Sequence, residues 1–167
     1  MFHRKHIFAG MTKIKYLLLL VGLAGCFASC SKDSFDADAQ FRNDTTAIRK
    51  FITDRKIPAI KDKSGVFYQI IAPGSGSVAY TANTSITAEY EGRLLDGAVF
   101  DGTKSGTPLT FALGGVITGW QIAIPFIQPG GQIRMILPSG YGYGNSAAGA
   151  IPANSILDFT VTLTAAK

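Results

Sequence analysis

The sequence is poor in the side chains that most often carry catalytic chemistry. Its 167 residues include two histidines, His3 and His6, and two cysteines, Cys26 and Cys30, all near the N-terminus. Beyond residue 30 the chain therefore has no histidine to act as the base of a catalytic triad, and no soft ligands of the kind that structural zinc requires. We expect no metal ion and no cofactor in the folded part of the protein.

An excess of charge is also missing from most of the chain. The formal net charge is +5, but the first 29 residues contribute four basic residues and no acidic one. The remainder holds 12 basic and 11 acidic residues. Because nucleic-acid binding relies on a strongly basic surface, we expect no nucleic-acid partner.

The apolar run at residues 16–24 is too short for a transmembrane helix, which needs about 20 apolar residues. It follows Lys13 and Lys15 and ends in small residues, which is the organisation of an export signal. Two consecutive segments then resemble the bacterial lipobox, in which the cysteine is acylated: Leu23-Ala24-Gly25-Cys26 and Phe27-Ala28-Ser29-Cys30. We expect residues 1–29 to be a lipoprotein signal peptide.

The choice between the two cysteines stays open, with Cys30 favoured. Cys26 has the better match to the box, but Cys30 is followed by Ser31-Lys32-Asp33, which resembles the start of many Bacteroidetes-type lipoproteins. An ordinary secretory signal with cleavage nearby is the alternative. The expected location is the envelope of a Gram-negative bacterium, with a lipid anchor, in the outer membrane and facing the periplasm or the outside. Acyl chains bind membranes at about 0.8 kcal/mol per buried methylene, so such an anchor would be lasting.

Residues 30–63 are expected to form a tether and then an amphipathic helix. From about residue 40 to 55, four apolar residues recur at helical spacing: Phe41, Ile48, Phe51 and Ile52. Pro58 then ends the helical pattern. The helix could pack on its own domain, pair with a second copy, or act as a spacer, and the pattern does not separate these arrangements.

Residues 64–167 have the pattern of a β domain with one short helix. Apolar and polar residues alternate over 86–94 and 157–163, and apolar strands are indicated at 66–71 and 132–137. Asp96-Gly97 is a hairpin signal, since this pair accepts positive φ. The expected fold is α+β, an antiparallel sheet around one short helix.

Trp120, the only tryptophan of the chain, opens that helix. It follows Val116-Ile117-Thr118-Gly119, and Ala123, Ile124 and Ile127 continue at helical spacing. Most tryptophans are buried packing residues, so a place in the plain core is one interpretation of Trp120. The floor of a binding pocket is the other.

Taken in order, these segments resemble the FKBP-type peptidyl-prolyl cis-trans isomerases, the macrolide-binding immunophilin family. The resemblance rests on segments 65–68, 90–94, 96–101, 108–114, 116–120, 141–144 and 151–157, in family order and at family-like separations. It implies an FKBP-like fold for residues 64–167.

The resemblance also implies a set of site residues. Asp101, Phe100 and Tyr143 would be the catalytic residues. The substrate-binding residues would be Tyr90, Val116, Ile117, Trp120, Ile151 and Phe159. Plain core is the alternative for each apolar member, and we interpret Phe111, Leu113 and Leu157 as core. Asp101 could instead cap the hairpin by bonding local amides.

The implied activity is rotation of X-Pro peptide bonds in exported proteins. Such rotation breaks no covalent bond, so it suits a domain without histidine. The implied partners are proline-containing polypeptides, and macrolides as a further ligand. Two alternatives remain open: a non-catalytic module that holds proline-containing segments in the same cleft, and a structural lipoprotein that self-associates through the helix at 40–55.

Overall fold

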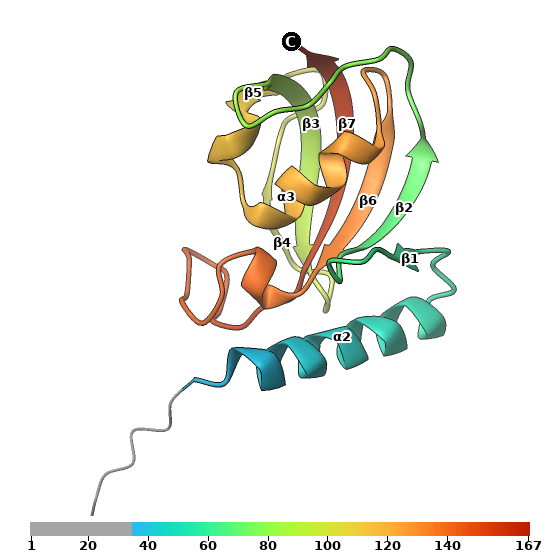
Figure 1. Cartoon of the computed structure of the whole chain (residues 1–167). Coiled ribbons are helices and arrows are strands. Elements are labelled where there is room, and N and C mark those ends of the chain that lie inside the picture. The colour runs from blue at the N-terminus through green and yellow to red at the C-terminus, as the bar shows by residue number, and fades with distance from the viewer. Residues whose placement is uncertain (1–34) are drawn as a thin grey trace, which may run out of the picture. The chain divides into compact units, whose positions relative to one another are not determined.

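A seven-stranded sheet wraps around a short helix in the computed structural model of the chain (Figure 1). The structure describes residues 35–167, and Phe35–Lys167 form one compact unit. The expected signal peptide and both candidate lipidation sites, Cys26 and Cys30, lie outside the described residues. Within the described part of the chain, no helix is both long and apolar enough to cross a membrane.

Every strand pairing in the sheet is antiparallel, and the strand order is β1-β2-β6-β7-β3-β4, with β5 pairing on β3. The strands are β1 (Ile60–Lys61), β2 (Phe67–Ala72), β3 (Ser85–Leu94), β4 (Val99–Gly102), β5 (Leu109–Ala112), β6 (Gln132–Leu137) and β7 (Leu157–Ala166). The expected antiparallel α+β fold is thereby confirmed. The two-residue strand β1 had no signal in the sequence, since two residues are too few to show a period.

Helix α2 (Ala37–Asp54) packs on the sheet of its own chain. It begins earlier than the apolar pattern indicated, because the side chain of Asp36 accepts a hydrogen bond from the Ala39 backbone N–H at 2.9 Å and caps the first turn. Its buried Ile48 contacts Phe67 and Ile136. Of the three arrangements open from sequence, packing on the chain's own domain is the one that the described residues show.

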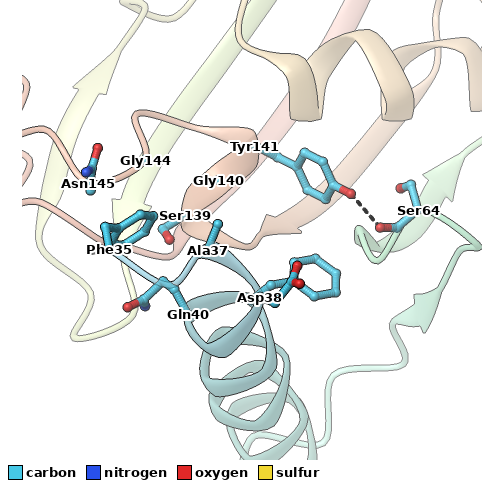
Figure 2. Close-up of a pocket in the computed structure, with 11 residues that line it drawn as sticks. Phe35, Ala37, Asp38, Gln40, Ser64, Ser139, Gly140, Tyr141, Gly144 and Asn145 are labelled. Atoms are coloured by element: carbon cyan, nitrogen blue, oxygen red, sulfur yellow. Dashed lines mark hydrogen bonds between the residues drawn. The ribbon is translucent and has the colours of Figure 1, made fainter. Parts of the chain in front are cut away.

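The start of α2 also lies against the loop that follows β6. A hollow of about 470 Å³ lies between parts of the two segments, and residues of both segments and Ser64 line it (Figure 2). The side chain of Tyr141 reaches toward Ser64, and its hydroxyl donates a hydrogen bond to the Ser64 carbonyl at 2.7 Å.

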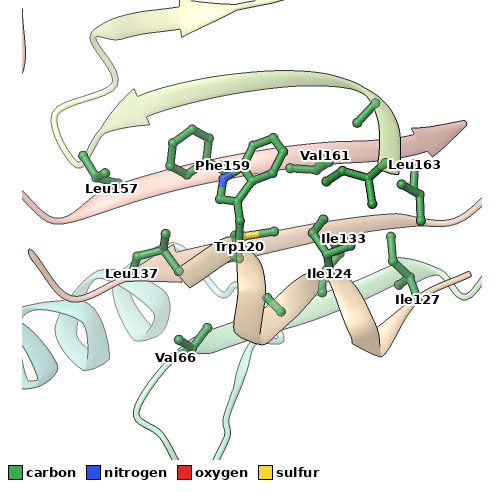
Figure 3. Close-up of a cluster of buried hydrophobic side chains, with 14 of the residues drawn as sticks. Val66, Trp120, Ile124, Ile127, Ile133, Leu137, Leu157, Phe159, Val161 and Leu163 are labelled. Atoms are coloured by element: carbon green, nitrogen blue, oxygen red, sulfur yellow. The ribbon is translucent and has the colours of Figure 1, made fainter. Parts of the chain in front are cut away.

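Helix α3 (Thr118–Ala123) lies on the other face of the sheet and buries Trp120 and Ala123 there. Neighbouring residues of a strand point to opposite faces, and Ile136 contacts α2 while Met135 and Leu137 belong to the cluster around α3. Figure 3 shows this cluster, with Leu157, Phe159, Val161 and Leu163 of β7 facing the helix. The helical spacing over 120–127 predicted a longer helix.

The structure instead continues as a 3-10 turn, η2 (Ile124–Phe126). Pro125 lacks the backbone N–H that the next α-helical hydrogen bond needs, so the regular helix ends before it.

Candidate active site

A cavity of about 330 Å³ opens between α3, the strands β3 to β5 and the loop after β6. Its lining residues are mostly aromatic: Tyr90, Phe100, Asp101, Phe111, Gly115, Val116, Ile117, Trp120, Tyr143 and Phe159. They come from six separate segments of the chain, so the site exists only in the folded domain.

Trp120 forms the floor of this cavity and is 4% exposed. Its ring meets Tyr90 edge to face at a centroid distance of 5.2 Å, and Phe159 at 5.5 Å. Edge-to-face pairs at these distances are the favoured geometry for aromatic rings, because the positive edge of one ring faces the negative face of the other. Figure 3 shows Trp120 rising from α3 toward β7, beside Phe159.

Phe100 completes the aromatic wall by packing against Phe159, with centroids 5.4 Å apart and ring planes at 86°. Both rings lie over Gly92 of β3. A Cβ atom at Gly92 would lie 2.6 Å from a carbon of Phe100 and 2.7 Å from a carbon of Phe159. The wall can approach the sheet this closely only because residue 92 has no side chain.

Asp101 is held at the mouth of the cavity by two hydrogen bonds. Its Oδ2 accepts from the Tyr90 hydroxyl at 2.7 Å, and its Oδ1 accepts from the Gly102 backbone N–H at 2.8 Å. The bond to Gly102 is the kind of local contact considered for Asp101 from sequence, while the bond to Tyr90 ties the carboxylate to the cavity wall. The structure therefore combines both interpretations.

The hydroxyl of Tyr90 remains protonated across the physiological pH range. Burial, followed by the hydrogen bond to Asp101, the charge of Asp101 and the charge of Tyr143, raises the pKa of Tyr90 to about 12. Tyr90 therefore serves as a hydrogen-bond donor that orients Asp101, and it has no proton to give up near neutral pH.

Val116 and Ile117 line the side of the cavity next to the floor, in the segment between η1 (Leu113–Gly115) and α3. The side chain of Gln121 donates a hydrogen bond to the Val116 carbonyl at 2.8 Å. This contact ties the segment back onto α3, so the two apolar side chains stay beside Trp120.

Tyr143 lies at the rim and is 43% exposed. It follows the short turn η3 (Ser139–Tyr141), in the glycine-rich loop that the sequence indicated as irregular. The loop places its hydroxyl-bearing ring among the lining residues although it belongs to no strand or α-helix.

The structure brings together eight of the nine residues that the resemblance assigned to the cavity. Ile151 is the exception: it is 6% exposed and belongs to the buried core cluster, where it bridges to Ala148. Phe111, interpreted from sequence as core, lines the cavity and contacts Tyr90 at a centroid distance of 6.1 Å. Core and cavity lie on the same side of the sheet, and Phe111 of β5 packs against the core cluster while it lines the cavity.

The chemistry that this site offers is apolar contact with a few fixed polar groups. Among residues 35–167 there is no group of three histidine, cysteine or acidic side chains that could hold a metal ion. Fold and site together define a small α+β domain with an apolar cavity over an aromatic floor, and with a carboxylate and a tyrosine hydroxyl among its lining groups.

Comparison with known proteins identifies the family. The model of the FKBP-type peptidyl-prolyl cis-trans isomerases matches residues 76–164. The Macrophage infectivity potentiator of Trypanosoma cruzi is 34% identical over 173 residues, which cover 99% of this chain and 87% of that protein. The chain belongs to the family of FKBP-type peptidyl-prolyl cis-trans isomerases.

Two further relatives show the extent of the likeness. The isomerase FkpA of Buchnera aphidicola is 43% identical over 104 residues, which cover 62% of this chain but 41% of that protein. The crystal structure of a peptidyl-prolyl cis-trans isomerase from Pseudomonas syringae matches with a TM-score of 0.64 at 29% identity, covering 80% of this chain and 98% of that one. The chain thus spans less than half of the FkpA relative that it matches.

Proposed function

We propose that this protein catalyses the cis-trans rotation of X-Pro peptide bonds in exported polypeptides. The observation that carries the proposal is the aromatic cavity over Trp120, with Asp101 fixed at its mouth by the Tyr90 hydroxyl. Membership of the isomerase family supports it.

The chemistry of the reaction suits this cavity. Rotation about a peptide bond costs about 18–20 kcal/mol because resonance gives the C–N bond double-bond character. Water bonded to the carbonyl favours the planar, charge-separated form of the amide. A pocket that holds the proline ring and removes this water makes the twisted form relatively less costly. No nucleophile or proton transfer is needed.

Each side chain then has a role that follows from its position. Trp120, Phe159 and Phe100 hold the proline ring by shape and keep the amide dry. Tyr143 at the rim and Asp101 at the mouth orient the substrate carbonyls and act on the developing charge of the twisted amide. Val116 and Ile117 complete the apolar side. We assign Asp101 to electrostatics rather than proton transfer, because rotation about the peptide bond breaks no covalent bond and needs no proton to move.

The single tryptophan offers a direct test that separates catalysis from simple binding. A proline-containing tetrapeptide titrated onto the purified chain should change the fluorescence of Trp120, because no other tryptophan contributes. The same preparation should accelerate the refolding of a protein whose slow phase is X-Pro isomerisation. A fluorescence change without acceleration would identify a binding module in place of an enzyme.

We propose that a lipid on Cys30 anchors the protein in the bacterial envelope, with Cys26 as the alternative site. The proposal rests on the lipobox resemblance and on the short apolar run before it. Mass spectrometry of the membrane-extracted protein decides it: Cys30→Ser should remove the acyl mass, while Cys26→Ser should keep it. An unacylated wild-type protein overturns the anchor.

We propose that macrolides compete with proline-containing clients for the apolar cavity over Trp120, as the resemblance to the macrolide-binding immunophilins implies. Self-association through α2 is not part of the proposal, because its apolar residue Ile48 packs against Phe67 and Ile136 of the same chain. Sedimentation of the purified protein checks this point, and a dimer abolished by polar substitutions on α2 would favour the self-associating structural lipoprotein considered from sequence.

A further inference from the structure

A buried carboxylate that does not line the cavity lies on α2. Asp44 is 3% exposed. Its Oδ2 accepts two hydrogen bonds from Ser139, at 2.8 Å from the backbone N–H and 2.6 Å from the hydroxyl. Its Oδ1 accepts a third, at 2.7 Å from the Gln40 amide. Burying a carboxylate is costly unless it is hydrogen-bonded, so these contacts determine where Asp44 and its partners can lie.

Ser139 connects Asp44 to the loop at the rim of the cavity. Its carbonyl accepts hydrogen bonds from the backbone N–H groups of Gly142 and Gly144, both at 2.9 Å. Tyr143, the lining residue of this loop, stands between these two glycines. One residue is therefore bonded to α2 through its donors and to both neighbours of Tyr143 through its acceptor.

A second contact holds the same loop to α2. Phe41 packs edge to face against Tyr141, with ring centroids 6.0 Å apart. The hydroxyl of Tyr141 donates to the Ser64 carbonyl at 2.7 Å (Figure 2). The loop that carries Tyr143 is thus held by α2 at two points, although α2 lies outside the matched region 76–164.

We propose that Asp44 is a positioning residue of the active site, acting through Ser139 on Tyr143. The helix that carries it is then a working part of the isomerase, because it determines where the tyrosine stands over the bound proline segment. The effect on substrate rests on the proposed function, whereas the effect on the loop does not.

The first test measures the loop without substrate. Hydrogen exchange of the Gly142 and Gly144 amides is followed by NMR in the full chain, comparing wild type with Asp44→Ala. Loss of the carboxylate leaves the Ser139 donors without their buried partner, so both amides should exchange about tenfold faster or more. The amide of Val161 in β7 should accelerate less than the two loop amides, because it reports unfolding of the central sheet.

Ile48→Ala is the matched control, because it truncates a buried side chain of the same helix without touching Ser139. It should leave the exchange of the loop amides within about twofold of wild type. Equal acceleration in both variants, or none in Asp44→Ala, overturns the proposal. If Asp44→Ala does not fold, Ser139→Ala serves instead: it keeps the backbone N–H contact, and intermediate acceleration is expected.

The second test measures catalysis. Asp44→Ala should raise KM for a proline tetrapeptide by about three- to tenfold and change kcat by less than about twofold, whereas Ile48→Ala should change neither. Asp44→Asn keeps an acceptor oxygen for Ser139 and should restore most of the loss. In a Tyr143→Ala background, Asp44→Ala should have no further effect on KM. An equal effect in both backgrounds contradicts a route through Tyr143.

The two tests fail in different ways. If the wild type does not accelerate X-Pro exchange at all, the proposed function is wrong, and the amide exchange still decides whether Asp44 holds the loop. If the wild type is active and Asp44→Ala is indistinguishable from it, the positioning role alone is wrong.

Discussion

Tyr90 connects the two kinds of surface that the candidate site combines. Its ring packs edge to face on Trp120, and its hydroxyl donates to Asp101 at 2.7 Å. A carboxylate at the mouth of an apolar cavity would otherwise rotate toward water, because water solvates it better than an aromatic wall does. Tyr90 therefore keeps Asp101 in place while it excludes water from the floor.

Tyr90→Phe removes this donor and keeps the ring. We expect kcat/KM for a proline peptide to fall by about tenfold, because one hydrogen bond to a charged group is lost. The raised pKa also predicts a pH effect on stability. Since the folded pKa of about 12 exceeds the unfolded value, the contribution of Tyr90 is complete below about pH 10 and is lost as pH rises toward 12.

Urea unfolding of wild type and Tyr90→Phe over the alkaline range measures this contribution. The stability advantage of the wild type should be constant up to about pH 10 and then shrink. An advantage that grows with pH would contradict the assigned direction of the shift.

Gly92 is the position where a single added methyl group should displace the aromatic wall of the cavity. Gly92→Ala would place Cβ within 2.7 Å of both Phe100 and Phe159, so the rings must move away from the sheet. We expect peptide affinity, measured by Trp120 fluorescence, to fall, and the free energy of unfolding to drop by about 1–3 kcal/mol. Gly140→Ala is the control, because a Cβ there has nothing within 4 Å. Equal behaviour of the two variants would contradict this account of the wall.

The sequence located most site residues but could not separate the cavity from the core. Tyr90, Phe100 and Trp120 were assigned from the resemblance, and the structure brings them together. Phe111 was interpreted as core but lines the cavity, whereas Ile151 was assigned to the cavity but belongs to the core cluster. Both are inward-facing apolar residues, and only the local shape of the loops decides which one meets empty space. Asp44 had no signal, because its partner Ser139 lies 95 residues away in the chain.

At the scale of elements, a paired charge joins the two central strands on the face opposite α3. Arg134 of β6 donates to both carboxylate oxygens of Asp158 in β7, at 2.9 and 2.6 Å, and Asp158 is 5% exposed. The hydrogen bond to Asp158 raises the pKa of Arg134, against the effect of burial. β7 also carries Phe159 to the cavity, so this pair fixes a strand on which the site depends.

Asp158→Asn should lower the free energy of unfolding by about 3 kcal/mol, because it leaves a partly buried guanidinium without its counter-charge. The double variant Asp158→Leu with Arg134→Met should recover much of this loss, since an apolar pair of similar volume needs no compensation. Denaturant unfolding of the three proteins provides the comparison. A double variant no more stable than Asp158→Asn would show that the pair does more than neutralise its own two charges.

The turn between β1 and β2 depends on one carboxylate. Asp62 Oδ1 accepts from the Ser64 hydroxyl at 2.6 Å and from the backbone N–H groups of Ser64, Gly65 and Val66. Burial raises the pKa of Asp62, but these bonds outweigh it and the net pKa lies below the ordinary value. A depressed folded pKa contributes stability that is present above the unfolded pKa and lost as pH falls through the folded one.

The acid limb of the stability curve should therefore be shallower in Asp62→Asn than in wild type below about pH 4. Thermal unfolding across the acid range checks this. Asp96→Asn is the comparison, since that exposed carboxylate accepts one hydrogen bond, from the Ala98 backbone N–H two residues on. Parallel acid limbs in Asp62→Asn and wild type would contradict the assignment.

Elements whose pattern extends over many residues were predicted from the sequence, whereas features that depend on a single residue were not. The alternation of β7 and the stripe of α2 extend over many residues, so chance matches are few. The early start of α2 depends on Asp36, the short α3 depends on Pro125, and β1 is two residues long. In each case one side chain or one pairing decides the structure, and no pattern precedes it.

At the scale of the whole molecule, the described chain joins an isomerase-type domain to a helix on the opposite face of its sheet. α2 packs on the sheet through Ile48, and Asp44 of the same helix bonds the loop after β6. α3 and the cavity lie on the other face of the sheet. A client polypeptide could thus reach the cavity without displacing the helix. We propose that this cavity lowers the barrier to X-Pro rotation.

NMR with catalytic amounts of protein measures the exchange between the cis and trans forms of an X-Pro peptide. This measurement decides whether the cavity catalyses the rotation. Wild type should accelerate the exchange, and both Asp101→Ala and Phe100→Ala should be slower by about tenfold or more, while remaining folded. Folded wild-type protein that leaves the exchange at its uncatalysed rate would contradict the account, and the cavity would then be a binding site alone.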